Sequence, residues 1–116
     1  MGQMLGDFEQ LILMALVRLR ANAYGVSMRK EIEERTGRSI SAGAIYTALD
    51  RLESRGFVSS RLGDSTPQRR GRPRKFYRLE PPGAEALNRS YSALSQMAKG
   101  IGPQLADLAA HAARTP

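Results

Sequence analysis

Apolar residues recur every three or four positions between residues 8 and 19, and this spacing predicts an amphipathic helix. Asp7 precedes the run and is expected to cap the helix, with Gln10 in the third helical position of an approximate capping box. The run is wider than one face, so a second side is expected to be buried as well, against another subunit or within the same chain. The first side carries Phe8, Leu11, Ile12, Ala15, Leu16 and Leu19, and the second carries Leu13, Met14 and Val17.

Two further helices are expected before residue 57. The first runs from about Val26 to Arg35, and Gly37 follows it as the left-handed residue that ends many helices. The second occupies residues 41–55, with Ser41 as its N-cap and Gly56 just after its end. Small residues fill the outward side of its first turn, so that side admits a close neighbour. Its inward residues are Ile45, Ala48, Leu49 and Leu52.

Residues 57–62 and 75–79 alternate between apolar and polar side chains, which predicts two strands. Pro67 and Pro73 are expected in the loop between them, because proline is excluded from the middle of a strand. Three helices followed by a hairpin is the order of a winged helix-turn-helix, in which the basic segment 62–75 is the wing. The predicted fold class is therefore mainly α with a small β-hairpin.

Residues 81–116 are expected to form a last helical element. Pro81 and Pro82 suit its first turn, and apolar residues then recur four and three apart, a heptad pattern typical of coiled coils. Pro103 interrupts the pattern and predicts two helical pieces, 83–99 and 103–113. We expect a winged helix-turn-helix domain at 1–80 and a C-terminal helical dimerisation element at 81–116; the alternative is a helix packed on its own domain. The expected dimer residues are Phe8, Leu87, Tyr91, Leu94, Ile101, Leu105 and Leu108.

Composition narrows the classes of function. The chain has 116 residues, enough for one domain, and 41% of them are hydrophobic, enough for a modest core. It has no Cys and one His, His111, and it lacks paired carboxylates in apolar surroundings and Gly-rich phosphate loops, so neither enzyme activity nor a cofactor is expected. The longest apolar run, 11–17, is far shorter than the roughly 20 residues of a membrane span. No signal peptide is evident, so a cytoplasmic location is expected.

The net charge of +7 is concentrated in one segment. Residues 61–80 hold seven Lys or Arg and two Asp or Glu, a net +5, while the regions on either side hold +1 each. The segment contains R-G-R-P, which looks like an AT-hook, a peptide that places arginines in the minor groove of A·T-rich DNA. A focused basic segment favours a polyanion as partner, and the alternative is a solvated charged loop.

Four segments of the chain, in this order, match the pattern of a known protein family. They are GDFEQLILMALVRL at 6–19, YGVSMRKEIEERTG at 24–37, SAGAIYTALDRLESRGFV at 41–58 and GRPRKFYRLEPPGAEAL at 71–87. In this order they resemble the PadR family of bacterial transcriptional regulators in its short form. The resemblance implies a winged-helix homodimer that represses neighbouring genes, and many members respond to phenolic acids, drugs or other small planar ligands. The chain departs from the family pattern at Ala44, Ile45 and Thr47, before the last helix, and at its glycine-proline break.

The expected DNA contacts lie in the helix 41–55, in the wing and at Tyr24. The N-terminal half of the helix is expected to enter the major groove, and Arg51 is its candidate for a guanine or a phosphate. Arg72 and Arg74 are expected to read the minor groove. Tyr24 resembles a phosphate contact of the family, and the alternative is a half-buried turn tyrosine. The complete set is Tyr24, Ser41, Ala42, Gly43, Ala44, Tyr46, Thr47, Arg51, Arg69, Arg70, Arg72, Arg74 and Lys75.

The leading hypothesis is a dimeric, sequence-specific transcriptional repressor that binds a double-stranded DNA operator. An architectural A·T-preferring DNA binder without a defined operator is the alternative, and a protein-interaction module is a third hypothesis. A small planar or apolar effector is a further partner to consider. The resemblance to the PadR family implies that its cavity would open between two subunits. Met4, Leu5, Phe8 and Met97 are candidate lining residues, and the alternative for each is ordinary dimer core.

Overall fold

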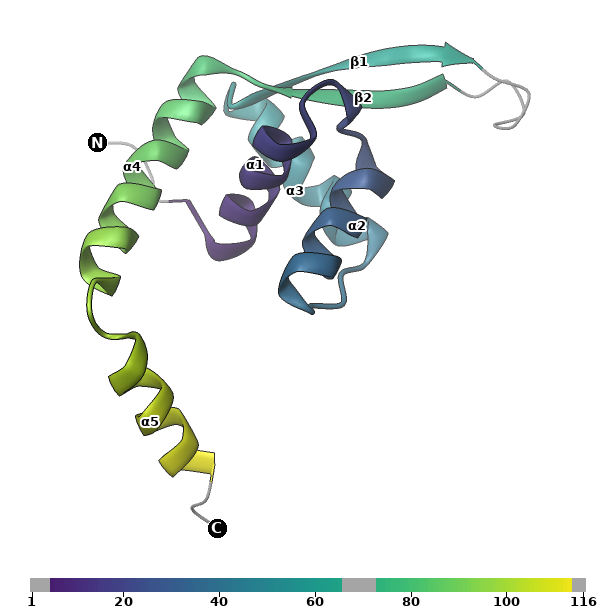
Figure 1. Ribbon diagram of the computed structural model, residues 1–116. Coiled ribbons are helices and arrows are strands. Elements are labelled where there is room, and N and C mark those ends of the chain that lie inside the picture. The colour runs from purple at the N-terminus through teal and green to yellow at the C-terminus, as the bar shows by residue number, and fades with distance from the viewer. Residues whose placement is uncertain (1–4, 66–72, 114–116) are drawn as a thin grey trace.

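The computed structural model describes residues 5–65 and 73–113, which form helices and one β-hairpin (Figure 1). The elements in chain order are α1 (Asp7–Leu19), η1 (Arg20–Asn22), α2 (Gly25–Thr36), α3 (Ala42–Ser54), β1 (Val58–Ser65), β2 (Pro73–Leu79), α4 (Pro81–Ala98) and α5 (Gly102–Ala113). Three helices followed by an antiparallel hairpin confirm the predicted winged helix-turn-helix order.

Helix α1 forms the centre of the core, because it contacts α2, α3, α4 and β2. Its Ile12, Leu13 and Leu16 are buried, and so are the four residues of α3 that were predicted to face inward, Leu49 among them. Leu13 is thus covered within its own chain, whereas Val17, on the same second side of α1, is 53% exposed. The second side of this helix is therefore buried by the chain itself only in part.

The start of α1 differs from the prediction. Its N-cap residue is Gly6, whose N–H donates to the carboxylate of Glu9 at 2.9 Å. Asp7 is instead the first helical residue, and its carboxylate pairs with Arg38 at 2.7 Å. The predicted cap by Asp7 and Gln10 is therefore wrong. Glu9 occupies the third helical position counted from Gly6, where a carboxylate reaches back to the free N–H of the cap residue.

The two strands of the hairpin are longer than predicted. Val58 lies opposite Leu79 at the end next to the helices, and Ser65 lies opposite Pro73 at the far end. Pro73 is therefore a strand residue and its placement in the loop was wrong. It occupies the first position of β2, where a strand tolerates the missing N–H of proline. Pro67 lies outside the described residues.

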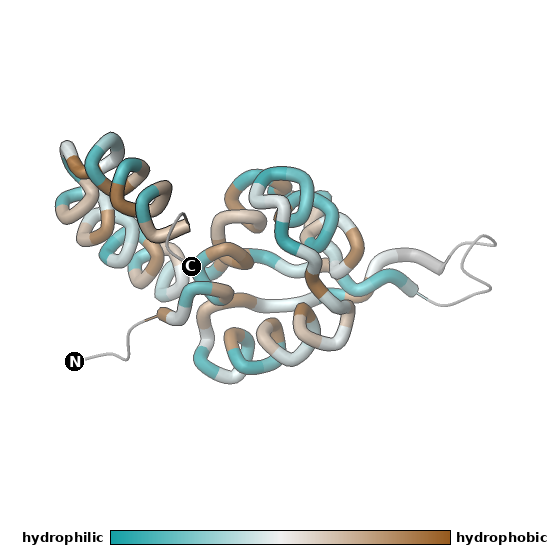
Figure 2. The backbone as a smooth tube through the Cα atoms, turned by 90° about the horizontal axis from the view of Figure 1, so that it is seen from below, coloured by the Kyte–Doolittle hydropathy of each residue, from teal (hydrophilic) through white to brown (hydrophobic). Residues whose placement is uncertain are grey.

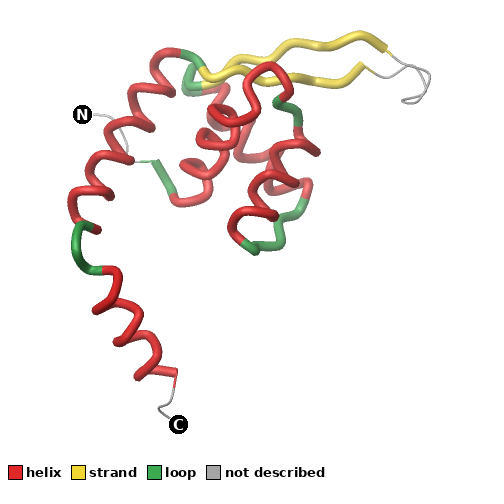
Figure 3. Tube along the Cα trace, viewed as in Figure 1, coloured by secondary structure: helices red, strands yellow, loops and turns green. Residues whose placement is uncertain are grey.

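Helices α4 and α5 form an arm that extends away from the other elements (Figures 1 and 3). Helix α4 begins with Pro81 and Pro82 in its first turn, as predicted. The break between the two helices falls at residues 99–101, where Gly100 has a φ of +75°. The two predicted helical pieces are therefore confirmed. Gly100 adopts the left-handed conformation that ends many helices, and Pro103 lies in the first turn of α5, where its missing N–H is tolerated.

The arm packs on the remainder of the chain only through its first turns. Ala86 and Leu87 of α4 are buried, whereas every residue of α5 is exposed. The radius of gyration is 17.1 Å, compared with about 13 Å for a compact domain of this length. Hydrophobic residues nevertheless recur along the arm (Figure 2). The arm therefore carries apolar side chains that its own subunit leaves uncovered.

None of the helices within residues 5–65 and 73–113 is long and apolar enough to cross a membrane.

Candidate nucleic-acid interface

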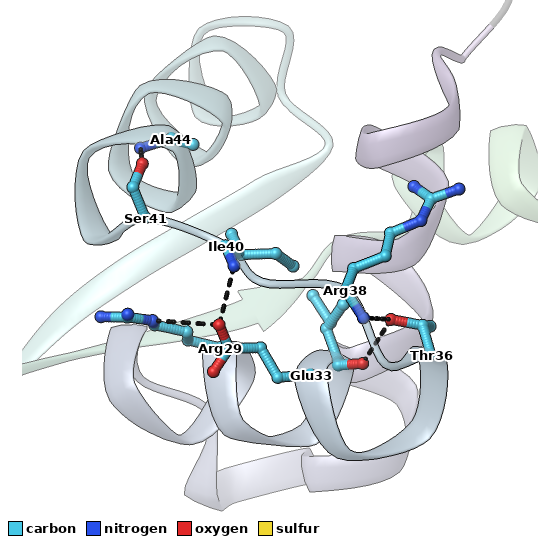
Figure 4. Close-up of polar contacts among 8 residues, drawn as sticks. Arg29, Glu33, Thr36, Arg38, Ile40, Ser41 and Ala44 are labelled. Atoms are coloured by element: carbon cyan, nitrogen blue, oxygen red, sulfur yellow. Dashed lines mark hydrogen bonds and ion pairs between the residues drawn. The ribbon is translucent and has the colours of Figure 1, made fainter.

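The turn between α2 and α3 is fixed by side chains of α2 (Figure 4). The carboxylate of Glu33 accepts a hydrogen bond from the N–H of Ile40 at 2.7 Å and lies 3.6 Å from Nε of Arg29. The hydroxyl of Thr36 accepts from the N–H of Arg38 at 3.2 Å. These contacts satisfy backbone groups that a short turn would otherwise leave unpaired, so they set the point at which α3 begins.

Helix α3 begins as predicted. The hydroxyl of Ser41 accepts a hydrogen bond from the N–H of Ala44 at 3.1 Å (Figure 4). Because the opposite face of α3 is buried in the core, the predicted DNA-facing side points outward. A methyl group at Gly43 would meet no atom within 4 Å. The predicted contact residues on this helix are all exposed: Ser41, Ala42, Gly43, Ala44, Tyr46, Thr47 and Arg51.

Tyr46 connects the exposed side of α3 with the start of α2. Its side chain is 43% exposed, yet its hydroxyl lies so close to Gly25 that a Cβ at that position would collide with it. Gly25 is the first residue of α2, and Tyr24 is the N-cap residue before it. The structure thus brings together Tyr24 and Tyr46, two predicted DNA-binding residues that are distant in the sequence.

Tyr24 is half-buried and lies at the base of the hairpin. Its ring packs edge-on against the ring of Phe76, with centroids 5.5 Å apart. The guanidinium group of Arg74 lies over the ring of Tyr24 at 4.1 Å, and that of Arg61 lies over the ring of Phe76 at 4.8 Å. We call these four residues, Tyr24, Arg61, Phe76 and Arg74, the wing-base stack. Two of its members, Arg61 and Phe76, were not among the predicted site residues. They lie opposite each other in the strand pairing, so their side chains share one side of the hairpin.

Of the remaining residues predicted for the wing, only one lies in the part of the chain that the structure describes. Arg69, Arg70 and Arg72 lie outside the described residues. Lys75 is exposed, and its ammonium group lies 5.6 Å from the ring centroid of Tyr77. The part of the hairpin that the structure describes therefore holds Arg61, Arg74 and Lys75 as cations near aromatic rings.

Two ionisable groups at the base of the hairpin have shifted pKa values. Burial raises the pKa of the Tyr77 phenol to about 12, and the nearby carboxylates of Asp50 and Glu53 add to this rise. The pKa of Glu80 is lowered, because its carboxylate accepts hydrogen bonds from Ser59 at 2.6 Å and from Arg78 at 3.2 Å. Tyr77 attaches the hairpin to the helices, since it is buried in the core, and Glu80 joins the two strands through Ser59 and Arg78.

A groove of about 640 Å³ lies where α4 packs on α1 and η1. Apolar and cationic side chains share its lining, which consists of Met14, Val17, Arg18, Arg20, Ala84, Leu87, Asn88 and Tyr91. The residues predicted to line an effector cavity differ in their burial. Leu5 is buried in the core of its own subunit, so its assignment to a cavity between subunits is wrong. Phe8 is half-buried against the core, Met97 is 79% exposed and Met4 lies outside the described residues.

Within residues 5–65 and 73–113, no three His, Asp or Glu side chains gather in a way that could hold a metal ion.

The element order, the capped and exposed third helix and the hairpin define the winged-helix class of DNA-binding folds. A family model described as the transcriptional regulator PadR-like family matches residues 12–89 of the chain. The chain therefore belongs to the PadR-like family. This is a family of transcriptional regulators and not of enzymes.

Solved structures agree with this assignment. A PadR family transcription regulator from Clostridium difficile is 28% identical, with a TM-score of 0.70 over 86% of this chain and 99% of that one. A PadR family transcriptional regulator from Eggerthella lenta is 29% identical, with a TM-score of 0.65 over 83% of this chain and 81% of that one. A winged-helix DNA-binding protein from STIV is 18% identical, with a TM-score of 0.67 over 84% of this chain and 98% of that one. At this identity the likeness shows the fold alone. Among curated proteins, no sequence matches the chain significantly.

Proposed function

We propose that this PadR-like regulator is a homodimeric repressor that binds a specific DNA operator. The observation that supports it most directly is the exposed first turn of α3, where Ser41 to Ala44 present only small side chains on a firmly capped helix. A helix start without bulky side chains can approach base edges in the major groove closely. The wing, 62–75, would bind the adjacent minor groove and phosphates.

The individual contacts follow from the chemistry of each side chain. Ser41 is placed to donate to a phosphate, together with the N–H groups at the start of α3. Ala42 and Ala44 can contact a thymine methyl, and Arg51 is the long basic residue on the same exposed side. Tyr24, Tyr46 and Thr47 carry hydroxyls for phosphates or base edges. In the wing, Arg69, Arg70 and Lys75 are proposed phosphate contacts and Arg72 is a proposed minor-groove contact.

Dimerisation is proposed to occur through the arm, which makes 81–116 a dimerisation element beside a DNA-binding domain at 1–80. In the isolated subunit Tyr91 is 58% exposed, Leu94 57%, Leu105 57% and Leu108 61%. These residues continue the heptad spacing that starts at Leu87, and a second copy of the same seam would cover them. Ile101 belongs to the same seam, and Phe8 of α1 is its proposed neighbour in the body of the subunit.

Relief by a small ligand is a further part of the proposal. The groove where α4 meets α1 lies beside the proposed dimer surface, and its apolar side chains suit a planar or apolar molecule. A ligand bound there would change how α4 sits on the DNA-binding part of the chain, and hence the distance between the two recognition helices of a dimer.

Footprinting on the DNA upstream of the protein's own gene tests the proposed function. A dimeric repressor protects two half-sites related by a pseudo-twofold axis, with centres about one helical turn of 10–10.5 base pairs, or a multiple of it, apart. If five or six phosphates are neutralised per dimer, the log–log dependence of affinity on salt has a slope of about −5. An architectural binder would instead protect every A·T-rich stretch without a fixed spacing, and that outcome would reject an operator.

A further inference from the structure

The wing-base stack joins segments that are far apart in the sequence. Tyr24 stands before α2, Arg61 lies on β1, and Arg74 and Phe76 lie on β2. The backbone joins at the same place, because the N–H of Tyr77 donates to the carbonyl of Ala23 at 2.8 Å. Tyr24 and Phe76 also form an isolated antiparallel bridge, so the residue before α2 acts as a third, very short strand beside β2. Figure 3 shows this loop directly beside the hairpin.

The ring of Phe76 is the centre of the stack. Its centroid lies 5.5 Å from that of Tyr24 and 4.8 Å from the guanidinium carbon of Arg61. Gly63 of β1 provides the room for it, since a Cβ there would lie 2.6 Å from the Cε1 atom of Phe76. A residue with any side chain at position 63 would displace the ring of Phe76. The position of the ring is therefore set by three neighbours at once.

Arg74 is oriented by this arrangement and not by hydrogen bonds from its Nε atom. That atom is buried, and it has no hydrogen-bond partner in the part of the chain that the structure describes. The guanidinium plane is held over the ring of Tyr24 at 4.1 Å. Stacking of this kind restrains an arginine side chain while its charge is retained. A restrained arginine loses less conformational freedom when it binds a phosphate.

The stack also connects the hairpin with the third helix. Tyr24 caps α2, and α2 sets the start of α3 through the contact between Glu33 and Ile40. A fixed contact between Tyr24 and Phe76 therefore fixes the hairpin relative to α3.

We propose that Phe76 and Tyr24 are positioning residues for DNA binding. Their rings hold the hairpin and α3 as one unit, and they hold Arg61 and Arg74 at the base of the wing as contacts for backbone phosphates. Arg74 thereby takes a role different from the minor-groove reading expected from R-G-R-P. The inference rests on the proposed function, because DNA is the partner whose phosphates the arginines bind. Ordinary packing is the competing role, and it would affect stability but not DNA affinity.

Three variants test the positioning role by titration of the operator duplex at several salt concentrations. Phe76→Leu removes the ring and keeps an apolar side chain, Phe76→Tyr restores the ring, and Val26→Ala alters an exposed apolar residue of α2 outside both the stack and the proposed DNA contacts. We expect Phe76→Leu to weaken operator binding roughly tenfold, about the effect of freeing one or two restrained side chains. Its salt slope should fall by about one to two, at roughly 0.9 per lost phosphate contact. Phe76→Tyr and Val26→Ala should bind within about twofold of the wild type.

A measurement without DNA separates this inference from the proposed function. Hydrogen exchange at the Tyr77 amide, which donates to Ala23, should become faster in Phe76→Leu, while the amide of Leu49 in the core of α3 keeps its wild-type rate. Faster exchange with unchanged operator affinity and salt slope would mean that the stack stabilises the fold without affecting DNA binding, and this would overturn the positioning role. Failure of the wild type to bind any operator would reject the proposed function instead, and the exchange rates would still report on the joint between hairpin and helices.

Arg74→Lys provides a second variant should Phe76→Leu not fold. Lysine keeps the charge but lacks the planar group that stacks on Tyr24. We expect unchanged thermal stability and operator binding weakened roughly three- to tenfold. Binding equal to that of the wild type would show that the stacked geometry of Arg74 does not serve DNA binding, and the proposed role of the stack would be withdrawn.

Discussion

Two regions of the subunit bury their apolar side chains to different extents. The body consists of α1 to α3 with the hairpin, and the arm consists of α4 and α5. The body surrounds Leu13, Met28 and Leu49 completely within one chain. The arm repeats its apolar residues just as regularly, but from Tyr91 onward it leaves them exposed. We propose that the body is stable by itself, whereas the exposed apolar residues of the arm are buried by a partner subunit. A change in the body should therefore act on folding, and a change in the arm on association.

The largest effect is expected in the body, from Leu49→Ala. Leu49 is fully buried between the helices, so the truncation leaves a cavity and should lower the free energy of unfolding by about 2–5 kcal/mol. Chemical denaturation followed by circular dichroism measures it. The matched change in the arm, Leu108→Ala, should cost less than about 1 kcal/mol under conditions in which the protein is monomeric. Equal losses for the two variants would remove the distinction between body and arm.

Association should respond to the arm alone. Leu94→Asp places a charge in the exposed heptad seam and should raise the dissociation constant of the dimer about a hundredfold or more, because burying an unpaired carboxylate costs several kcal/mol. Gln96→Asp adds the same charge on the opposite side of α4 and serves as its control. Sedimentation velocity over a concentration series gives both constants. A dimer unaffected by Leu94→Asp would place the interface elsewhere.

The body should lose stability in alkali through Tyr77. The pKa of this phenol is raised to about 12 in the folded state, above its ordinary value of 10.0, so the folded protein keeps a proton that the unfolded chain releases. This stability is fully present below pH 10 and is lost as the pH rises to about 12, by roughly 2–3 kcal/mol. Denaturation at pH 9 and pH 11.5 measures the loss. Tyr77→Phe should flatten this dependence, and Tyr91→Phe in the arm should leave it unchanged.

The smallest effect on the fold is expected at Gly43, where stability and DNA binding should change in opposite directions. Ala suits a helix better than Gly by up to about 1 kcal/mol, and a methyl group at this position meets no atom within 4 Å. Gly43→Ala should therefore raise the melting temperature slightly. Operator affinity should fall, because the backbone of the first turn of α3 is proposed to approach the DNA. Unchanged affinity in the stabilised variant would place the DNA away from this turn.

The sequence allowed the body to be predicted in most respects, because periodic apolar residues, Ser41, Gly37 and the paired strands each have one strong local interpretation. The start of α1 was missed because two acidic residues, Asp7 and Glu9, compete there as capping partners. The structure pairs Asp7 with Arg38, which is distant in the sequence, and no local pattern reports that contact. Pro73 was misplaced because the rule against proline within strands does not apply to a first strand position.

The candidate site was predictable only where it depends on one element. The exposed face of α3 follows from helical periodicity, since Ile45, Leu49 and Leu52 define its buried face. The wing-base stack could not be predicted from the sequence, because it joins Tyr24 to a strand about fifty residues later, and no local pattern reports such a contact. The effector cavity expected between two subunits was assigned in part to a wrong residue, since Leu5 is buried in the core of its own subunit.

Fluorescence anisotropy with a labelled duplex from the region upstream of the gene tests the central proposal most directly. A scrambled duplex of equal A·T content is the control, and both are titrated at two salt concentrations. A specific repressor should prefer the upstream duplex by about a thousandfold or more and keep that preference at the higher salt. Equal binding to both duplexes that disappears with added salt would contradict operator recognition and leave the basic wing as a general DNA clamp.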